Sequence, residues 1–95
     1  MSYRLIPGVV CATIFDEYFL IASMEARGMV NAIREINETG AFFWKLLEAN
    51  ADLGEIVAQT TMEYEVSEED AEAAFKAFAA ALRDAGYLIL EEEPT

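Results

Sequence analysis

The sequence predicts an α+β fold in which a three-stranded antiparallel sheet is followed by three helices and a short C-terminal strand. Residues 9–36 hold β-rich runs separated by short turns, whereas residues 37–86 hold three segments with apolar residues at helical spacing. After Gly86, the segment YLIL indicates a short strand or a docked tail. This order of elements, strands first and helices afterwards, is typical of the α+β class.

The β-rich half begins with a predicted hairpin. Its strands are Val9–Phe15 and Tyr18–Met24, joined by the short acidic turn DE. A second turn at EARG, where Gly28 is free to adopt a positive φ, leads to a third extended segment, Met29–Ile36. Apolar and polar residues fall on both faces of this segment, a pattern that favours an edge strand over a central one.

Each predicted helix begins at a residue that can cap it. Asn37, Asp52 and Ser67 carry side-chain oxygens that can accept hydrogen bonds from the free amides of the next turn. The first helix is expected to end near Asn50, and Gly86 is expected to end the third.

The third helix has two unlike flanks beside its core-facing residues. One flank carries Glu72, Lys76 and Arg83, and the other is nearly all alanine, including Ala74, Ala77 and Ala81. The alanines form a smooth strip that another backbone could approach. Alanine is also the strongest helix former, so helix propensity explains the strip equally well.

Length and composition predict one small domain, residues 1–95, in the cytoplasm. The apolar fraction of 55% is too high for a disordered chain, even with a formal net charge of −12. No apolar run approaches the ~20 residues that a membrane helix needs, and the first residues lack the apolar stretch of a secretory signal. Cys11, the single cysteine, is expected to be a small apolar strand residue and not a reactive thiol.

The residue types argue against catalysis. The chain has no histidine, which removes the usual general base and the commonest metal ligand. Its carboxylates fall in first turns of helices and on exposed faces, where solubility and the helix dipole explain them. The glycines do not follow a phosphate-loop spacing, and the acids do not follow a calcium-loop pattern. We therefore expect no enzymatic activity, no cofactor and no metal.

Charge argues against nucleic-acid binding. Three helices attached to β-strands also describe a winged helix, whose third helix would read DNA. In this sequence the helix beginning at Ser67 has more acidic than basic residues, whereas a DNA-reading helix needs Lys and Arg to contact phosphates.

Peptide binding is the hypothesis that the residues favour. An extended peptide could form backbone hydrogen bonds along Met29–Ile36, while its alternate side chains enter a trough beside the third helix. The same edge could instead stay solvated or pair with its copy in a homodimer.

From Ile36 onwards the sequence resembles the PqqD-like family, which includes proteins similar to the pyrroloquinoline quinone biosynthesis chaperone and the precursor-recognition domains of ribosomal peptide modification. The resemblance covers about the last two thirds of the chain. It is carried by Asn37, Thr39, Gly40, Phe43-Trp44, Leu46-Leu47, Ile56, Tyr64, Val66, Ser67, Asp70, Phe78, Leu82 and Gly86.

This resemblance implies a winged-helix-like arrangement of the three-stranded sheet and three helices. It also implies a non-catalytic chaperone that binds the leader of a ribosomally made precursor as an added strand. The implied partners are that leader peptide and a modifying enzyme, often a radical S-adenosylmethionine enzyme, with no nucleic acid and no membrane. The alternative is a structural or regulatory dimerising module with a degenerate winged-helix fold.

The resemblance also implies where the peptide would bind. The strand residues are Met29, Val30, Asn31, Ala32, Ile33, Arg34 and Glu35, and the helix residues are Ala74, Lys76, Ala77, Ala81 and Arg83. Because the family motif does not determine which helix flank faces the peptide, both flanks are included.

Overall fold

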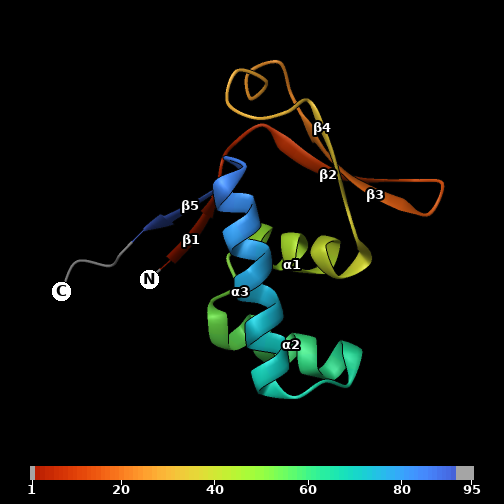
Figure 1. The fold of residues 1–95 in the computed structure, drawn as a ribbon, viewed down its shortest axis with the longest axis vertical. Coiled ribbons are helices and arrows are strands. Elements are labelled where there is room, and N and C mark those ends of the chain that lie inside the picture. Colours follow the sequence, from red (N-terminus) through yellow and green to blue (C-terminus); the bar gives the residue numbers. More distant parts are fainter. Residues whose placement is uncertain (1, 92–95) are drawn as a thin grey trace.

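The computed structural model describes residues 2–91, in which two small antiparallel sheets lie beside α1 and one end of α3, and α2 packs on the other end of α3 (Figure 1). In chain order the elements are β1 (Ser2–Leu5), β2 (Val9–Ile14), β3 (Glu17–Ala22), β4 (Ile33–Ile36), α1 (Glu38–Glu48), α2 (Leu53–Tyr64), α3 (Glu68–Asp84) and β5 (Leu88–Glu91). One sheet has the order β2-β3-β4, and β1 pairs with β5 in the other. The predicted fold class is therefore confirmed.

The predicted hairpin is present, with its turn one residue earlier than expected. Phe15 and Asp16 form the turn with φ values of 50° and 65°, and Glu17 already belongs to β3. Two consecutive positive φ values suit a two-residue hairpin connection, because they match the twist of the flanking strands. The side chain of Phe15 is 96% exposed at the tip of the hairpin.

The third strand is shorter than predicted, since β4 contains only Ile33–Ile36. The prediction that Met29–Ala32 belongs to this strand is wrong. The amides of Met29 and Val30 both donate to the carbonyl of Ala26, at 2.9 and 3.1 Å, as in a helical turn. Because these amides bond back to their own segment and the Val30 side chain is buried, the chain becomes extended only after residue 32.

The N-terminal strand β1 was not predicted. Its residues alternate between polar and apolar, Ser2-Tyr3-Arg4-Leu5, but four residues is the shortest run in which alternation indicates a strand, so the signal is weak. It pairs antiparallel with β5, with Ser2 opposite Glu91 and Leu5 opposite Leu88. Arg4 and Glu91 add an exposed ion pair at 3.0 Å, which contributes little in water.

All three predicted helix caps are confirmed. The side chain of Asn37 accepts from the Gly40 amide at 2.7 Å, Asp52 accepts from Glu55 at 2.8 Å, and Ser67 accepts from Asp70 at 3.1 Å. Replacing such a cap with alanine typically costs ~1 kcal/mol, so each residue stabilises the start of its helix.

Aromatic side chains hold α1 and α3 together. The ring of Phe43 lies edge-on to Phe75 with centroids 5.4 Å apart, and its centroid is 5.5 Å from that of Phe78. Trp44 is buried on the same helix and lies edge-on to Tyr87, which follows α3. Burying each such side chain contributes ~1.5–3 kcal/mol, so this cluster stabilises the helical half. Within residues 2–91 no helix has the length and apolar character that crossing a membrane requires.

Replacing Gly86 with alanine is expected to lower the free energy of unfolding by ~1–2 kcal/mol. Gly86 has φ +92°, and a Cβ there would lie 3.2 Å from the carbonyl oxygen of Met29 and 3.3 Å from Val30. Urea unfolding of Gly86→Ala would measure this loss. Gly28→Ala is the matched control, because a Cβ at residue 28 has no atom within 4 Å. Equal stabilities of the two variants would contradict the prediction.

Candidate peptide-binding site

One side of β4 has no neighbouring strand within residues 2–91, because β4 is the outer strand of the sheet β2-β3-β4. We call this side the free edge. The hydrogen bond from the Ala22 amide to the Ala32 carbonyl, 2.8 Å, shows which residues of β4 form backbone hydrogen bonds with β3. Along an antiparallel strand, the backbone groups of successive residues point alternately to one side and to the other. Arg34 and Ile36 therefore direct their backbone N–H and C=O groups to β3. Ile33 and Glu35 direct theirs to the free edge. The free edge therefore offers two residues for pairing with an extended peptide.

A hollow of about 450 Å³ lies beside the end of β4, between the first turn of α1 and the flank of α3. We call it the apolar hollow, and it is lined by Asn37, Thr39, Gly40, Phe43, Ala74, Ala77 and Phe78. Its floor is wide because three of these residues carry no more than a methyl group. A Cβ at Gly40 would lie 2.9 Å from the Phe78 ring, so a larger residue there would push that ring and change the shape of the hollow.

A second hollow, about 500 Å³, lies at the other end of β4, beside the residue that follows α3. We call it the arginine hollow, and it is lined by Arg27, Gly28, Met29, Val30, Asn31, Arg34 and Ala85. The two hollows thus lie at opposite ends of the same short strand. Both are bounded by the α3 segment, through Ala74 and Ala77 at one end and Ala85 at the other.

These features suit the recognition of an extended peptide, because they join an unpaired strand edge to hollows for side chains. A family model described as coenzyme PQQ synthesis protein D (PqqD) matches residues 20–88, which is more than half of the chain. The chain belongs to the PqqD family.

Solved structures share the fold of this PqqD-family chain. TbiB1 in complex with the TbiA(beta) leader peptide has a TM-score of 0.75 and 26% identity, and the match covers 95% of this chain and 99% of that chain. Lasso peptide synthetase B1 complexed with the leader peptide also has a TM-score of 0.75, at 22% identity, with 95% and 100% of the two chains covered. At that lower identity the likeness shows the fold alone. None of the curated proteins matches the chain significantly.

The structure places only some of the predicted strand residues of this PqqD-family chain on β4, and of these Ile33 and Glu35 face the free edge. Ile33, Arg34 and Glu35 are on β4, and the Ile33 side chain, 63% exposed, lies on the opposite face of the strand from Arg34. Met29, Val30 and Asn31 instead line the arginine hollow, and Ala32 immediately precedes the strand.

On α3 the alanine flank borders the apolar hollow. Ala74 and Ala77 line it, and Ala81 is exposed one turn further along. Lys76 instead lies 3.8 Å from Glu72, which lines a hollow with Val57 of α2, on the other flank of the helix. Arg83 lies 3.7 Å from Asp84.

Sequence reasoning missed several lining residues. Asn37 is predicted only as a helix cap and Arg27 only as part of a turn, and Gly40 and Phe78 are named only among the residues that carry the family resemblance. The one local signal for the apolar hollow was Gly40, since glycine inside a helix costs ~1 kcal/mol and so often permits a close approach.

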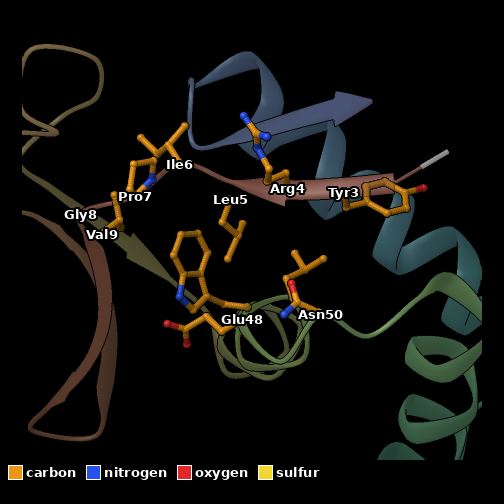
Figure 2. Close-up of a pocket in the computed structure, with 11 residues that line it drawn as sticks. Tyr3, Arg4, Leu5, Ile6, Pro7, Gly8, Val9, Glu48 and Asn50 are labelled. Atoms are coloured by element: carbon orange, nitrogen blue, oxygen red, sulfur yellow. The ribbon is translucent and has the colours of Figure 1, made fainter. Parts of the chain in front are cut away.

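Another hollow, about 290 Å³, lies between β1 and the end of α1 (Figure 2). Leu5 points from β1 towards α1, whereas Arg4 points away, and Glu48 and Asn50 lie on the α1 side. Trp44 also lines this hollow, and its buried indole N–H has no acceptor among residues 2–91. Within the same range, no group of three or more His, Cys, Asp or Glu residues is arranged to hold a metal ion.

Among the described residues, 2–91, two groups have clearly shifted pKa values. Burial raises the pKa of the Cys11 thiol, with a smaller opposing effect from Lys45. Burial also raises the pKa of the Tyr64 phenol, and the negative charge of Glu38 acts in the same direction.

The Cys11 thiol is expected to react slowly with iodoacetamide at neutral pH. A raised pKa leaves less thiolate at a given pH, and the thiolate is the reactive form. The pH profile of the alkylation rate should therefore have its midpoint at higher pH in the folded protein than in the same protein unfolded in urea. A folded midpoint at or below the unfolded one would contradict the shift.

Proposed function

We propose that this PqqD-family protein binds the leader segment of a ribosomally made precursor peptide and presents it to a modifying enzyme. The observation that carries the proposal is the free edge of β4 next to the apolar hollow. The leader adds as a strand to the free edge, and one of its apolar side chains enters the apolar hollow.

The solved relatives support the choice of ligand. Both are complexes with leader peptides, and they share the fold of this chain over nearly its full length. The enzyme that receives the leader is expected, from the family resemblance, to be a radical S-adenosylmethionine enzyme.

Backbone pairing and side-chain burial contribute differently to the binding energy. Ile33 and Glu35 can each exchange backbone hydrogen bonds with the leader, and each such bond contributes a net ~0.5–1.5 kcal/mol. Filling the apolar hollow with a large apolar side chain contributes ~1.5–3 kcal/mol. Ordering and immobilising the leader oppose both terms, so we expect a dissociation constant no lower than the micromolar range.

In this proposal the protein has no catalytic role of its own. The chain has no histidine, and its only thiol has a raised pKa. It promotes modification by holding the leader and the enzyme together, which raises the effective concentration of the substrate peptide at the enzyme.

Isothermal titration calorimetry tests the proposal directly. The ligands are synthetic peptides that correspond to any short open reading frames next to the gene for this protein. Heat with micromolar affinity for one of them supports the proposal, and the absence of heat with all of them contradicts it. The competing function, a dimerising module that pairs through β4, predicts a dimer in analytical ultracentrifugation that dissociates when β4 is blocked.

Filling the apolar hollow is expected to weaken leader binding at least tenfold. Ala74→Lys places a long charged side chain at the mouth of the hollow, where it competes with the apolar side chain of the leader. Ala73→Lys is the matched control, since Ala73 is also exposed on α3 but is not among the residues that line the hollow. Calorimetry would measure both affinities, and circular dichroism would verify that both variants fold. Equal affinities would contradict the assignment of the hollow.

Strand addition also predicts an alternating sensitivity to N-methylation of the leader. Amides that donate to the Ile33 and Glu35 carbonyls should be essential, because a methyl group removes the donor and blocks close approach of the two strands. Methylation at the intervening residues should change affinity much less. A series of singly N-methylated leaders, measured by calorimetry, would reveal the pattern. Uniform sensitivity along the leader would indicate a different mode of binding.

A further inference from the structure

Two of the few basic residues in this chain line one hollow, and neither has a carboxylate partner in the part of the chain that the structure describes. The chain has 6 Lys and Arg against 18 Asp and Glu. Arg4, Lys76 and Arg83 each have a carboxylate within 4.0 Å. Arg27 and Arg34 have none within that distance among residues 2–91, and both line the arginine hollow. In so acidic a protein, two unpaired arginines in one hollow favour binding of an external anion.

A hydrogen bond and the strand register position the two arginines of the arginine hollow. Arg27 donates from Nε to the Ala22 carbonyl at 3.2 Å, which leaves its terminal nitrogens free to contact a ligand. Arg34 lies on the same face of the sheet as the fully buried Leu20, because the two residues pair in the β3–β4 register. Its half-buried side chain therefore lies on the side of β4 where the hollow meets Ala85.

We propose that the arginine hollow binds a carboxylate side chain, Asp or Glu, of the leader peptide. The proposal rests on the proposed function, since the leader must lie along the free edge to reach the hollow. A guanidinium group donates two parallel hydrogen bonds to a carboxylate, so Arg27 and Arg34 discriminate an acid from its neutral amide by geometry as well as by charge. The rest of the protein has a net negative charge and repels an acidic leader residue. The arginine hollow therefore determines the position in the leader at which an acidic residue strengthens binding.

The structure also determines the spacing of the leader residues. Both hollows lie on the helix side of β4, and strand residues on one face recur at every second position. From Ala77 or Ala74 in one hollow to Ala85 in the other, the α3 segment advances ~12–17 Å at 1.5 Å per residue, and residues two or six positions apart on a strand, at ~7 or ~20 Å, do not match this distance. Residues i and i+4 of a strand are ~13–14 Å apart at 3.4 Å per residue. The acidic residue is therefore four positions from the apolar one. In a leader that runs antiparallel to β4, the apolar residue precedes the acidic residue in the sequence, because β4 runs from the arginine hollow to the apolar hollow.

A small-molecule titration tests the hollow without any leader. N-acetyl-glutamate α-methylamide carries one side-chain carboxylate, and N-acetyl-glutamine α-methylamide is its neutral control. The acid should give saturable NMR shifts, in the millimolar range, at the Nε–H signals of Arg27 and Arg34. The amide should not shift them, and Arg34→Gln should abolish the response of Arg27. Equal shifts with both compounds, or equal shifts at Arg4 and Arg83, would overturn the proposal.

A double-mutant cycle tests the role of the hollow in leader binding. For a leader that binds in calorimetry, changing the acid four positions from the apolar residue to its amide should weaken binding at least fivefold. In the Arg34→Gln variant, the same change in the leader should weaken binding less than twofold. The Arg83→Gln variant should show the same fivefold loss of affinity as the unmodified protein, because Arg83 lies outside the hollow. Moving the acid by one position should weaken binding as much as removing it.

The outcomes separate the two proposals. If a leader binds but the cycle shows no coupling, the carboxylate assignment fails and the proposed function stands. If no leader binds, the proposed function fails, and so does the carboxylate assignment, since it rests on that function. The glutamate titration then shows whether the hollow is an anion site of another kind.

Discussion

The packing of Phe43 against α3 is the contact on which the candidate site depends. Phe43 lies against both Phe75 and Phe78, with centroids 5.4 and 5.5 Å away, and this pair of contacts determines how closely α3 approaches α1. The approach is close because Gly40, one turn earlier on α1, has no side chain. Since α1 follows directly from β4, holding α3 against α1 also places the alanine flank of α3 beside the end of β4. The apolar hollow is the space that remains.

A second set of contacts holds the other end of α3. Tyr87 is fully buried, its hydroxyl donates to the Asn31 carbonyl at 3.2 Å, and its own carbonyl accepts from the Ile6 amide at 3.1 Å. These bonds join the turn before β4, the end of α3 and the segment after β1. The pairing of β1 with β5 continues this connection on the side of the molecule away from the hairpin (Figure 1). Contacts of the buried Phe43 and Tyr87 thus hold the segments that border the two hollows, which favours a site whose geometry exists before a ligand binds.

Side chains of opposite charge lie near the two ends of α3. Glu68, Glu69 and Asp70 occupy the first turn of α3, where the helix dipole stabilises them, and Arg27 and Arg34 lie near its other end. A peptide that bound through its backbone alone could pair with the free edge in more than one register, because backbone hydrogen bonds do not depend on the side chains. In the proposed mode of binding, an apolar hollow and a cationic hollow at a fixed separation provide that information. The proposed function then lets a small domain select one segment of one peptide.

The sequence by itself determined the elements whose stabilising contacts are local. Asn37, Asp52 and Ser67 begin their helices through bonds that span three residues, so the starts of all three helices were predictable. The hairpin was predictable for the same reason, apart from a shift of one residue at its turn. The edge position of β4 also followed from its mixed pattern of apolar and polar residues, as the strand order confirms.

Tertiary contacts decided the length of β4, the existence of β1 and the lining of both hollows. The composition of Met29–Ala32 suits a strand, but the Val30 side chain is buried against Gly86, which is far away in the sequence. The Val30 amide donates to the Ala26 carbonyl in the preceding turn and so does not pair with a strand. Strand β1 forms because β5, at the other end of the described chain, pairs with it. Likewise, nothing near Arg27 in the sequence indicates that Arg34 and Ala85 share its hollow. Such contacts join residues that local propensity cannot relate, so only the folded chain reveals them.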